Sequence, residues 1–259
     1  MDLDLQGKNA IVTGGTRGIG RAIAELLAAE GCNVALCARH EAAVDATVAA
    51  LAARGVKSWG GRVDVGEIEG LRGWVATAAD VLGGLDIFVA NVSALAQSMD
   101  DDSWRRSLEI DIMGTVAGVE AAIPFLEKSQ AGAIVVVGTT GAIEIAGPPR
   151  PYASAKAALV PYVKALARNL AGKNIRANMV SPGNVYFKGG VWSILEQNNP
   201  AQFKTMLERN PMGRMGTPED CRQRRRLSGE PARQLHHRHQ PDRRRRADPA
   251  RAVLTPARE

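Results

Sequence analysis

The sequence predicts one α/β domain in which helices cover both faces of a single doubly wound parallel sheet. Short apolar runs alternate with longer amphipathic segments from Asn9 to about Ser181, as expected of successive strand and helix units. Some runs are apolar at every position, for example residues 133–137, as in strands buried on both faces. A glycine-rich segment, residues 14–20, lies between the first apolar run and the first amphipathic segment.

Six apolar runs are the expected strands, and five amphipathic segments are the expected helices. The strands are residues 10–13, 33–37, 58–63, 86–90, 133–138 and 176–180. The helices are residues 18–29, 41–54, 68–82, 104–127 and 152–171. Residues 184–217 contain Gly, Asn and Pro around two short amphipathic segments, and we expect them to form a mobile lid.

Charge, hydropathy and cysteine content restrict the partners of the chain. The net charge is +6, but residues 221–259 carry twelve Arg and four acidic side chains, which leaves a net charge of −2 on residues 1–220. We therefore expect no nucleic-acid partner. No run of about 18 apolar residues or signal-peptide pattern is visible, so we expect a cytoplasmic protein with no membrane partner. Cys32, Cys37 and Cys221 are odd in number and lack CxxC spacing, which suits a reducing compartment.

The glycine-rich turn predicts a dinucleotide site. Gly14, Gly18 and Gly20 permit a tight turn and a close approach of backbone to a pyrophosphate at the helix N-terminus. An ordinary glycine-rich loop is the simpler alternative. The acidic residue that would bind the ribose of NAD is absent, because Ala38 occupies its position with Arg39 beside it. Arg39 and Arg17 favour NADP(H), with NAD(H) as the alternative if both are ordinary surface arginines.

Tyr152 and Lys156 are the candidate proton-transfer pair. They stand four residues apart at the start of a helix and therefore share one face. A neighbouring ammonium and an oxidised nicotinamide both favour the phenolate, so the pair can exchange a proton with an alcohol or carbonyl oxygen. The Tyr-x-x-x-Lys spacing alone is common on helix surfaces, so the assignment of a proton-transfer pair depends on the surrounding motifs.

Taken together, the motifs resemble the classical short-chain dehydrogenase/reductase family over residues 5–220. The matching segments are residues 13–20, Asp64-Val65, Thr139, residues 152–156 and Ser181-Pro182-Gly183. The resemblance implies a Rossmann-type fold and an oxidoreductase. The implied catalytic residues are Tyr152, Lys156, Thr139 and Asp111. The implied cofactor-binding residues are Gly14, Thr16, Arg17, Gly18, Ile19, Gly20, Arg39, Asp64, Val65, Asn91, Tyr152, Lys156 and Val185.

Four features depart from the family pattern. The family's Asn-Asn-Ala-Gly turn after the fourth strand reads Ala90-Asn91-Val92-Ser93. Thr139 stands where the family has serine, Asp111 where it has asparagine, and Phe187 where it has threonine. The Tyr152 and Lys156 pair is intact, so we expect an NADP(H)-dependent carbonyl reductase or secondary-alcohol dehydrogenase with Tyr152 as general acid/base. The apolar residues of the lid suggest a hydrophobic or extended small-molecule carbonyl or alcohol substrate; the alternative is that they only pack the lid on the body of the domain. A non-catalytic dinucleotide-binding sensor is the alternative, and we expect no metal.

Residues 221–259 differ in character from the rest of the chain. They have arginine runs and little apolar periodicity, so we expect an irregular segment outside a domain of residues 1–220. We interpret them as a translation in the wrong reading frame. Read one base later from Cys221, the codons permit V-A-N-A-V-V-F-L-A-S-P-x-A-S-F-I-T-G-T-N-L-I-V-D-G-x-L-T, which resembles the last helix and strand of the family. A frame-corrected chain should form a homo-oligomer.

Overall fold

The computed structural model describes residues 4–144 and 148–221, which all belong to one compact unit. The expected irregular segment falls on residues 222–259, outside the described residues, except for its first residue, Cys221. Within the described ranges, no helix combines the length and the hydropathy needed to cross a bilayer.

Six parallel strands form the sheet, in the order β3-β2-β1-β4-β5-β6. Their bounds are β1 Asn9–Thr13, β2 Asn33–Ala38, β3 Ser58–Arg62, β4 Ile87–Ala90, β5 Gly132–Val137 and β6 Ile175–Val180. The chain runs outward from β1 to β3 and then returns to β4 on the other side of β1. The doubly wound parallel sheet predicted from the alternation of runs is confirmed, and each strand lies within about one residue of its predicted position.

The helices connect these strands as predicted, with one difference. Their bounds are α1 Gly18–Ala29, α2 Glu41–Ala52, α3 Ile68–Leu82, α4 Asp101–Arg106, α5 Gly114–Leu126, α6 Pro151–Leu170, α7 Val191–Asn198 and α8 Pro200–Glu208. The predicted single helix over residues 104–127 is instead α4, a π-helical segment η1 (Ser107–Met113) and α5 in succession.

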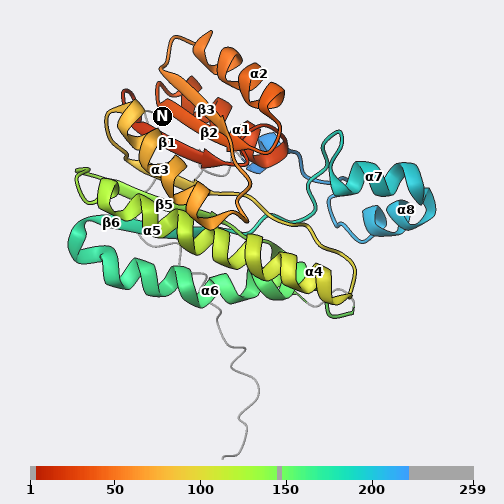
Figure 1. Ribbon diagram of the computed structural model, residues 1–259. Coiled ribbons are helices and arrows are strands. Elements are labelled where there is room, and N and C mark those ends of the chain that lie inside the picture. The colour runs from red at the N-terminus through yellow and green to blue at the C-terminus, as the bar shows by residue number, and fades with distance from the viewer. Residues whose placement is uncertain (1–3, 145–147, 222–259) are drawn as a thin grey trace, which may run out of the picture. The chain divides into compact units, whose positions relative to one another are not determined.

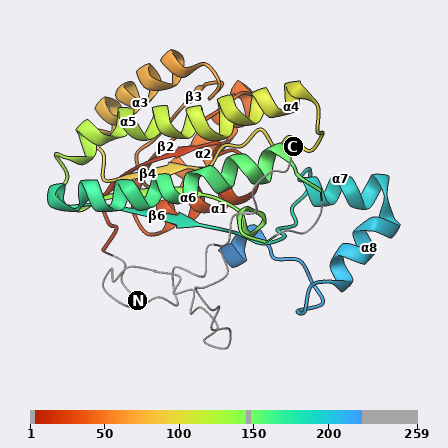
Figure 2. The ribbon, with the colours of Figure 1, turned by 90° about the horizontal axis from the view of Figure 1, so that it is seen from below.

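The two faces of the sheet are covered differently. On one face, α3, α5 and α6 pack on a core that contains Ile11, Phe88 and Ile134. On the other face, α1 and α2 pack on β1, β2 and β3, with Val12, Val34 and Leu36 in the core. Figure 1 shows α3, α5 and α6 together along one side of the strands. The helices α7 and α8 pair with each other and project from the sheet in both views (Figures 1 and 2).

Candidate active site

The turn between β1 and α1 is built around glycines whose backbone angles or close contacts disfavour a side chain. Gly14 and Gly18 have φ angles of 67° and 53°, in the left-handed region that favours glycine. A Cβ atom on Gly20 would collide with the Gly14 carbonyl oxygen. Helix α1 starts at Gly18, so its free N–H groups lie at this turn. The glycines of this turn carry no side chains of their own at a helix N-terminus, which fits the binding of a pyrophosphate group.

Asn91 ties this turn to the end of β4. Its side-chain amide donates to the carbonyl oxygens of Thr13 and Gly14, each at 3.1 Å. Its backbone N–H donates to the Thr13 hydroxyl at 3.0 Å. Asn91, which the sequence places among the expected cofactor-binding residues, therefore fixes the backbone of the glycine-rich turn.

A second polar site lies where β2 and β3 end. Arg39, His40, Arg62 and Asp64 line a cavity of about 390 Å³. The strands place them together, because Ala38 is in register with Arg62. Arg62 and His40 were not among the predicted residues, although pairing the ends of the two strands would have suggested them. Two guanidinium groups and an imidazole against one carboxylate form a set of donors that fits a phosphate group.

Arg17 lies in a different place from Arg39. Its guanidinium is 3.5 Å from the Gly189 carbonyl oxygen in the loop before α7, and it does not line the cavity of Arg39. The Ile19 side chain lines an apolar pocket on the sheet, so any contact with the cofactor would use its backbone. Asp64 accepts a hydrogen bond from Gly66 N at 3.0 Å, and Val65 is buried.

Lys156 is buried on α6 and is held by two groups from other elements. Its ammonium donates to the Val92 carbonyl oxygen at 3.3 Å and lies 3.3 Å from Asp111 Oδ1. The side chains of Lys156 and Asp111 are 2% and 0% exposed. Because Val92 follows Asn91, the same short segment contacts both the ammonium and the glycine-rich turn. The two predicted parts of the site are therefore adjacent.

Asp111 is positioned by the π-helical segment η1. A π turn adds one residue to a helical turn, and such turns occur frequently at functional sites. Asp111 Oδ2 accepts a hydrogen bond from Ala94 N at 3.3 Å. Asp111 Oδ1 has no hydrogen-bond partner within the described part of the chain, and it depends on the ion pair with Lys156. This carboxylate is thus the counter-ion of the lysine.

The environment of Tyr152 favours its neutral form. Burial raises the pKa of the Tyr152 phenol, the neighbouring Thr139 hydroxyl lowers it through a hydrogen bond, and the negative charge of Asp111 raises it. Burial also lowers the pKa of the Lys156 ammonium, whereas Asp111 raises it. Thr139 follows β5 and accepts a hydrogen bond from Gly141 N at 3.2 Å, which orients its hydroxyl.

Phe187 lies over the start of α1. A Cβ atom on Gly18 would be 2.6 Å from Phe187 Cζ, so the ring rests directly on the glycine. The same ring contacts Gly190. Val185 is buried and pairs with Gly216 as an isolated bridge, which joins the two ends of the predicted lid. Phe187 departs from the family pattern, but its contact with Gly18 was not predicted from the sequence.

Cys37 lies under the glycine-rich turn at the end of β2. Its carbonyl oxygen accepts hydrogen bonds from the backbone N–H groups of Gly14 and Gly15. Complete burial raises the pKa of its thiol to about 12.

Comparison with known proteins identifies the family of this chain. Residues 14–224 match the family described as enoyl-(acyl carrier protein) reductase. The chain is 36% identical over 220 residues to isoepoxydon dehydrogenase of Penicillium expansum, covering 83% of this chain and 85% of that protein. The chain belongs to the short-chain dehydrogenase/reductase family. It is therefore an oxidoreductase of that family, as the motifs predicted.

Solved structures of the family share the fold. A short-chain dehydrogenase from Burkholderia cenocepacia in complex with NADP aligns with a TM-score of 0.75 and 30% identity, over 84% of this chain and 88% of that one. L-sorbose reductase from Gluconobacter frateurii, complexed with NADPH and L-sorbose, aligns with a TM-score of 0.78 and 29% identity, over 85% and 88%.

Proposed function

We propose that this short-chain dehydrogenase/reductase is a carbonyl reductase or secondary-alcohol dehydrogenase that prefers NADP(H). The observation that carries the proposal is the segment Asn91-Val92. Asn91 bonds to the glycine-rich turn, and Val92 accepts a hydrogen bond from Lys156. A dinucleotide bound at that turn would therefore extend toward Lys156 and toward Tyr152 on the same helix, which we propose as the proton-transfer group.

Tyr152 would be the acid and base of the reaction. In reduction its phenol donates a proton to the carbonyl oxygen, and in oxidation its phenolate accepts the proton of the alcohol. The nicotinamide, when bound, supplies or accepts the hydride. Because burial raises the pKa of Tyr152, the phenol predominates at neutral pH, and this form serves reduction.

Thr139 and Lys156 would support this step in different ways. The Thr139 hydroxyl would hold the substrate oxygen beside Tyr152 through a hydrogen bond. The positive charge of Lys156 would stabilise the phenolate that forms when the proton leaves. Asp111 would hold the Lys156 ammonium in place from a distance of 3.3 Å.

The preference for NADP(H) rests on the cavity at the ends of β2 and β3. A 2′-phosphate there would meet Arg39, Arg62 and His40. The single carboxylate of the cavity, Asp64, follows β3 rather than β2. An NAD-binding site of this fold places its acidic residue at the end of β2, where this chain has Ala38.

We propose an apolar substrate because several apolar side chains of the lid, residues 184–217, are exposed and could contact one. Val191 and Ile194 on α7 are 38% and 50% exposed, and Met212 after α8 is 72% exposed. Exposed side chains of this kind can cover a hydrophobic ligand when a lid closes.

The test is a substrate panel with oxidation of NADPH as the readout. The panel contains apolar ketones, a 3-oxoacyl thioester and an enoyl thioester, each also measured with NADH. We expect turnover of at least one ketone or 3-oxoacyl compound and a fall of at least ~100-fold in kcat for Tyr152→Phe, with nearly unchanged cofactor affinity. Cofactor binding without turnover of any compound would favour the sensor, and wild-type rates for Tyr152→Phe would refute the mechanism.

A further inference from the structure

The ring of Phe187 lies between two glycines that belong to different elements. Gly18 is the first residue of α1, and Gly190 directly precedes α7. A Cβ atom on Gly18 would be 2.6–2.9 Å from three atoms of the ring, and a Cβ atom on Gly190 would be 2.9–3.1 Å from three. The ring therefore fits because neither glycine has a side chain. We call this space the Gly18–Gly190 slot.

The start of α1 under this ring offers hydrogen-bond donors that suit an anion better than a phenyl group. The first N–H groups of a helix have no partner within the helix. Arg17 is the N-cap residue of α1, and within the described ranges its side chain makes no capping hydrogen bond. A phenyl ring accepts hydrogen bonds only weakly, whereas the oxygens of a pyrophosphate group accept them strongly. A pyrophosphate group is therefore the better occupant of this place.

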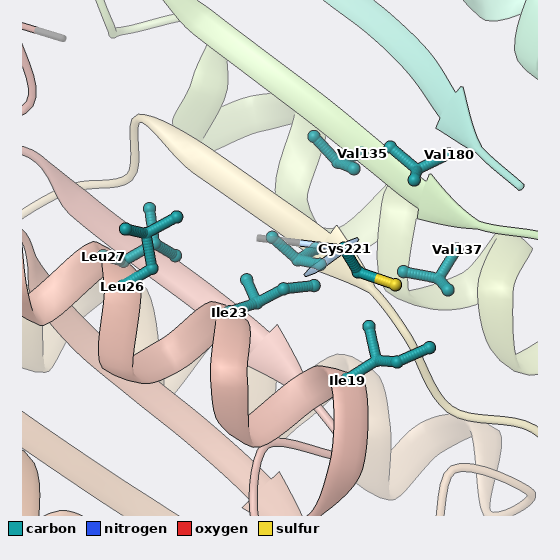
Figure 3. Close-up of a pocket in the computed structure, with 9 residues that line it drawn as sticks. Ile19, Ile23, Leu26, Leu27, Val135, Val137, Val180 and Cys221 are labelled. Atoms are coloured by element: carbon teal, nitrogen blue, oxygen red, sulfur yellow. The ribbon is translucent and has the colours of Figure 1, made fainter. Parts of the chain in front are cut away.

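The α1 side of the slot is firmly held. The Ile19 and Ile23 side chains extend from α1 into an apolar pocket on the sheet (Figure 3). Val135 and Val137 of β5 also line that pocket. Shifting α1 to make room above Gly18 would expose this apolar surface to water, which is unfavourable. An anion that binds at the start of α1 must therefore be accommodated from the other side of the slot.

The α7 side of the slot is held less firmly. Among the described elements, α7 and α8 pack closely only on each other, and they project from the sheet in Figures 1 and 2. The turn that carries the ring is closed by a hydrogen bond of 3.0 Å from Gly190 N to the Phe187 carbonyl oxygen. Across the slot, the Arg17 guanidinium makes a long hydrogen bond of 3.5 Å to the Gly189 carbonyl oxygen. This side can therefore move with little loss of packing.

We propose that Phe187 is a gate of the dinucleotide site. Its ring closes the Gly18–Gly190 slot over the start of α1, and binding of the pyrophosphate displaces it. Because residues 188–190 alone join Phe187 to α7, the displacement moves α7 as well, so dinucleotide binding and the position of the lid are coupled. This inference rests on the proposed dinucleotide site. It does not depend on the reaction or on the choice between NADP(H) and NAD(H), because both carry the pyrophosphate.

A closed gate lowers the apparent affinity for the dinucleotide. The apparent Kd equals the intrinsic Kd divided by the fraction of molecules in which the gate is open. Phe187 is half-buried, and its ring leaves apolar contacts in the slot when the gate opens. Full burial of a phenyl ring stabilises by more than the ~1.4 kcal/mol of a tenfold ratio, so partial burial suffices for a closed-to-open ratio of about ten. Removing the ring should tighten binding by about that factor.

The first test measures association and dissociation of NADPH and of NADH by stopped-flow fluorescence. For both dinucleotides, Phe187→Ala should raise the association rate constant by ~10-fold, because the start of α1 is then open in every molecule. The dissociation rate should stay nearly unchanged, because the ring has already left the slot in the complex. The matched control is Phe203→Ala, which removes a ring of α8 that packs edge-on against Tyr186. It should bind both dinucleotides at wild-type rates.

The second test follows α7 by fluorine NMR of the full chain labelled with 5-fluorotryptophan. Trp192 is the second residue of α7, and Trp192→Phe identifies its resonance. Addition of NADP⁺ should shift this resonance. In Phe187→Ala it should lie nearer the bound position before any dinucleotide is added, which a direct effect of the dinucleotide would not produce. Trp59 and Trp74, which stack on each other at 5.8 Å between ring centroids, are internal controls whose resonances should stay in place.

Three outcomes would overturn the inference. Equal association rates in the wild-type chain and Phe187→Ala would show that the ring does not obstruct the site. Faster dissociation from Phe187→Ala, with an unchanged association rate, would show that the ring contacts the bound dinucleotide instead of excluding it. A Trp192 resonance that stays in place would show that α7 does not follow the gate. These readouts report binding and not turnover, so a failure here is distinct from a failure of the proposed reaction.

Discussion

Removing the carboxylate of Asp111 should destabilise the protein because it leaves a buried ammonium without a counter-ion. The Lys156 Nζ and Asp111 Oδ1 atoms are 3.3 Å apart. At an effective dielectric constant of about 20, their attraction is on the order of 5 kcal/mol. Desolvation opposes the formation of such a pair, but removal of one partner typically costs about 3–5 kcal/mol. We therefore expect Asp111→Ala to lower the free energy of unfolding by about that amount.

A double-mutant cycle measured by urea unfolding at pH 7 tests this expectation. Asp111→Ala and Lys156→Met each leave one buried charge, whereas the double variant leaves none. The double variant should therefore lose at least ~2 kcal/mol less than the sum of the two single variants. The control is Lys173→Met, which breaks an exposed ion pair with Glu127 and should cost less than ~1 kcal/mol. Additive effects at Asp111 and Lys156 would refute the reasoning.

The same carboxylate should also affect the pH dependence of the reaction. Asp111 raises the pKa of Tyr152, so Asp111→Asn, which keeps the shape and removes the charge, should lower that pKa. Alcohol oxidation requires the phenolate, and its rising limb should move to lower pH. Carbonyl reduction requires the phenol, and its falling limb should move in the same direction. Initial rates in both directions between pH 6 and pH 11 measure this, and limbs that do not move would contradict it.

Three further substitutions test the remaining parts of the site. Thr139→Ala should reduce kcat by ~10-fold or more, though less than Tyr152→Phe, because one oriented hydrogen bond is lost; an unaffected rate would make Thr139 structural. Arg39→Asp should shift the ratio of kcat/KM values from NADP(H) toward NAD(H), and an unchanged ratio would show that Arg62 and His40 suffice or that the cavity binds no phosphate. Phe187→Ala should lower the Kd of the dinucleotide in fluorescence titration, because the ring now rests on Gly18; an unchanged or higher Kd would show that the ring does not obstruct the site.

Apolar periodicity predicted the sheet and most helices because apolar residues recur at one spacing along the whole length of each element. Helices α1 and α3 begin and end at the residues predicted from apolar spacing. The region of residues 104–127 was predicted less well. Its composition is that of one continuous helix, and a π turn changes the backbone hydrogen bonds without an obvious change in residue pattern.

The candidate site was predicted in its parts but not in its internal contacts. Tyr152, Lys156, Thr139 and Asp111 were identified from motifs, whereas the ion pair between Lys156 and Asp111 joins two helical segments 45 positions apart. Only the packing of η1 against α6 brings those groups together. Arg62 was missed for a similar reason, because its partner Ala38 lies on a different strand and no local pattern connects them.

The burial of Cys37 bears on how this enzyme would withstand oxidative stress. Thiols react with peroxides and alkylating agents as thiolates. Because burial raises the pKa of the Cys37 thiol to about 12, this thiol stays protonated at neutral pH. Cys37 anchors the glycine-rich turn through its backbone carbonyl oxygen, and burial keeps its side-chain sulfur from reacting with oxidants. Oxidants that act on reactive thiols should leave the glycine-rich turn intact.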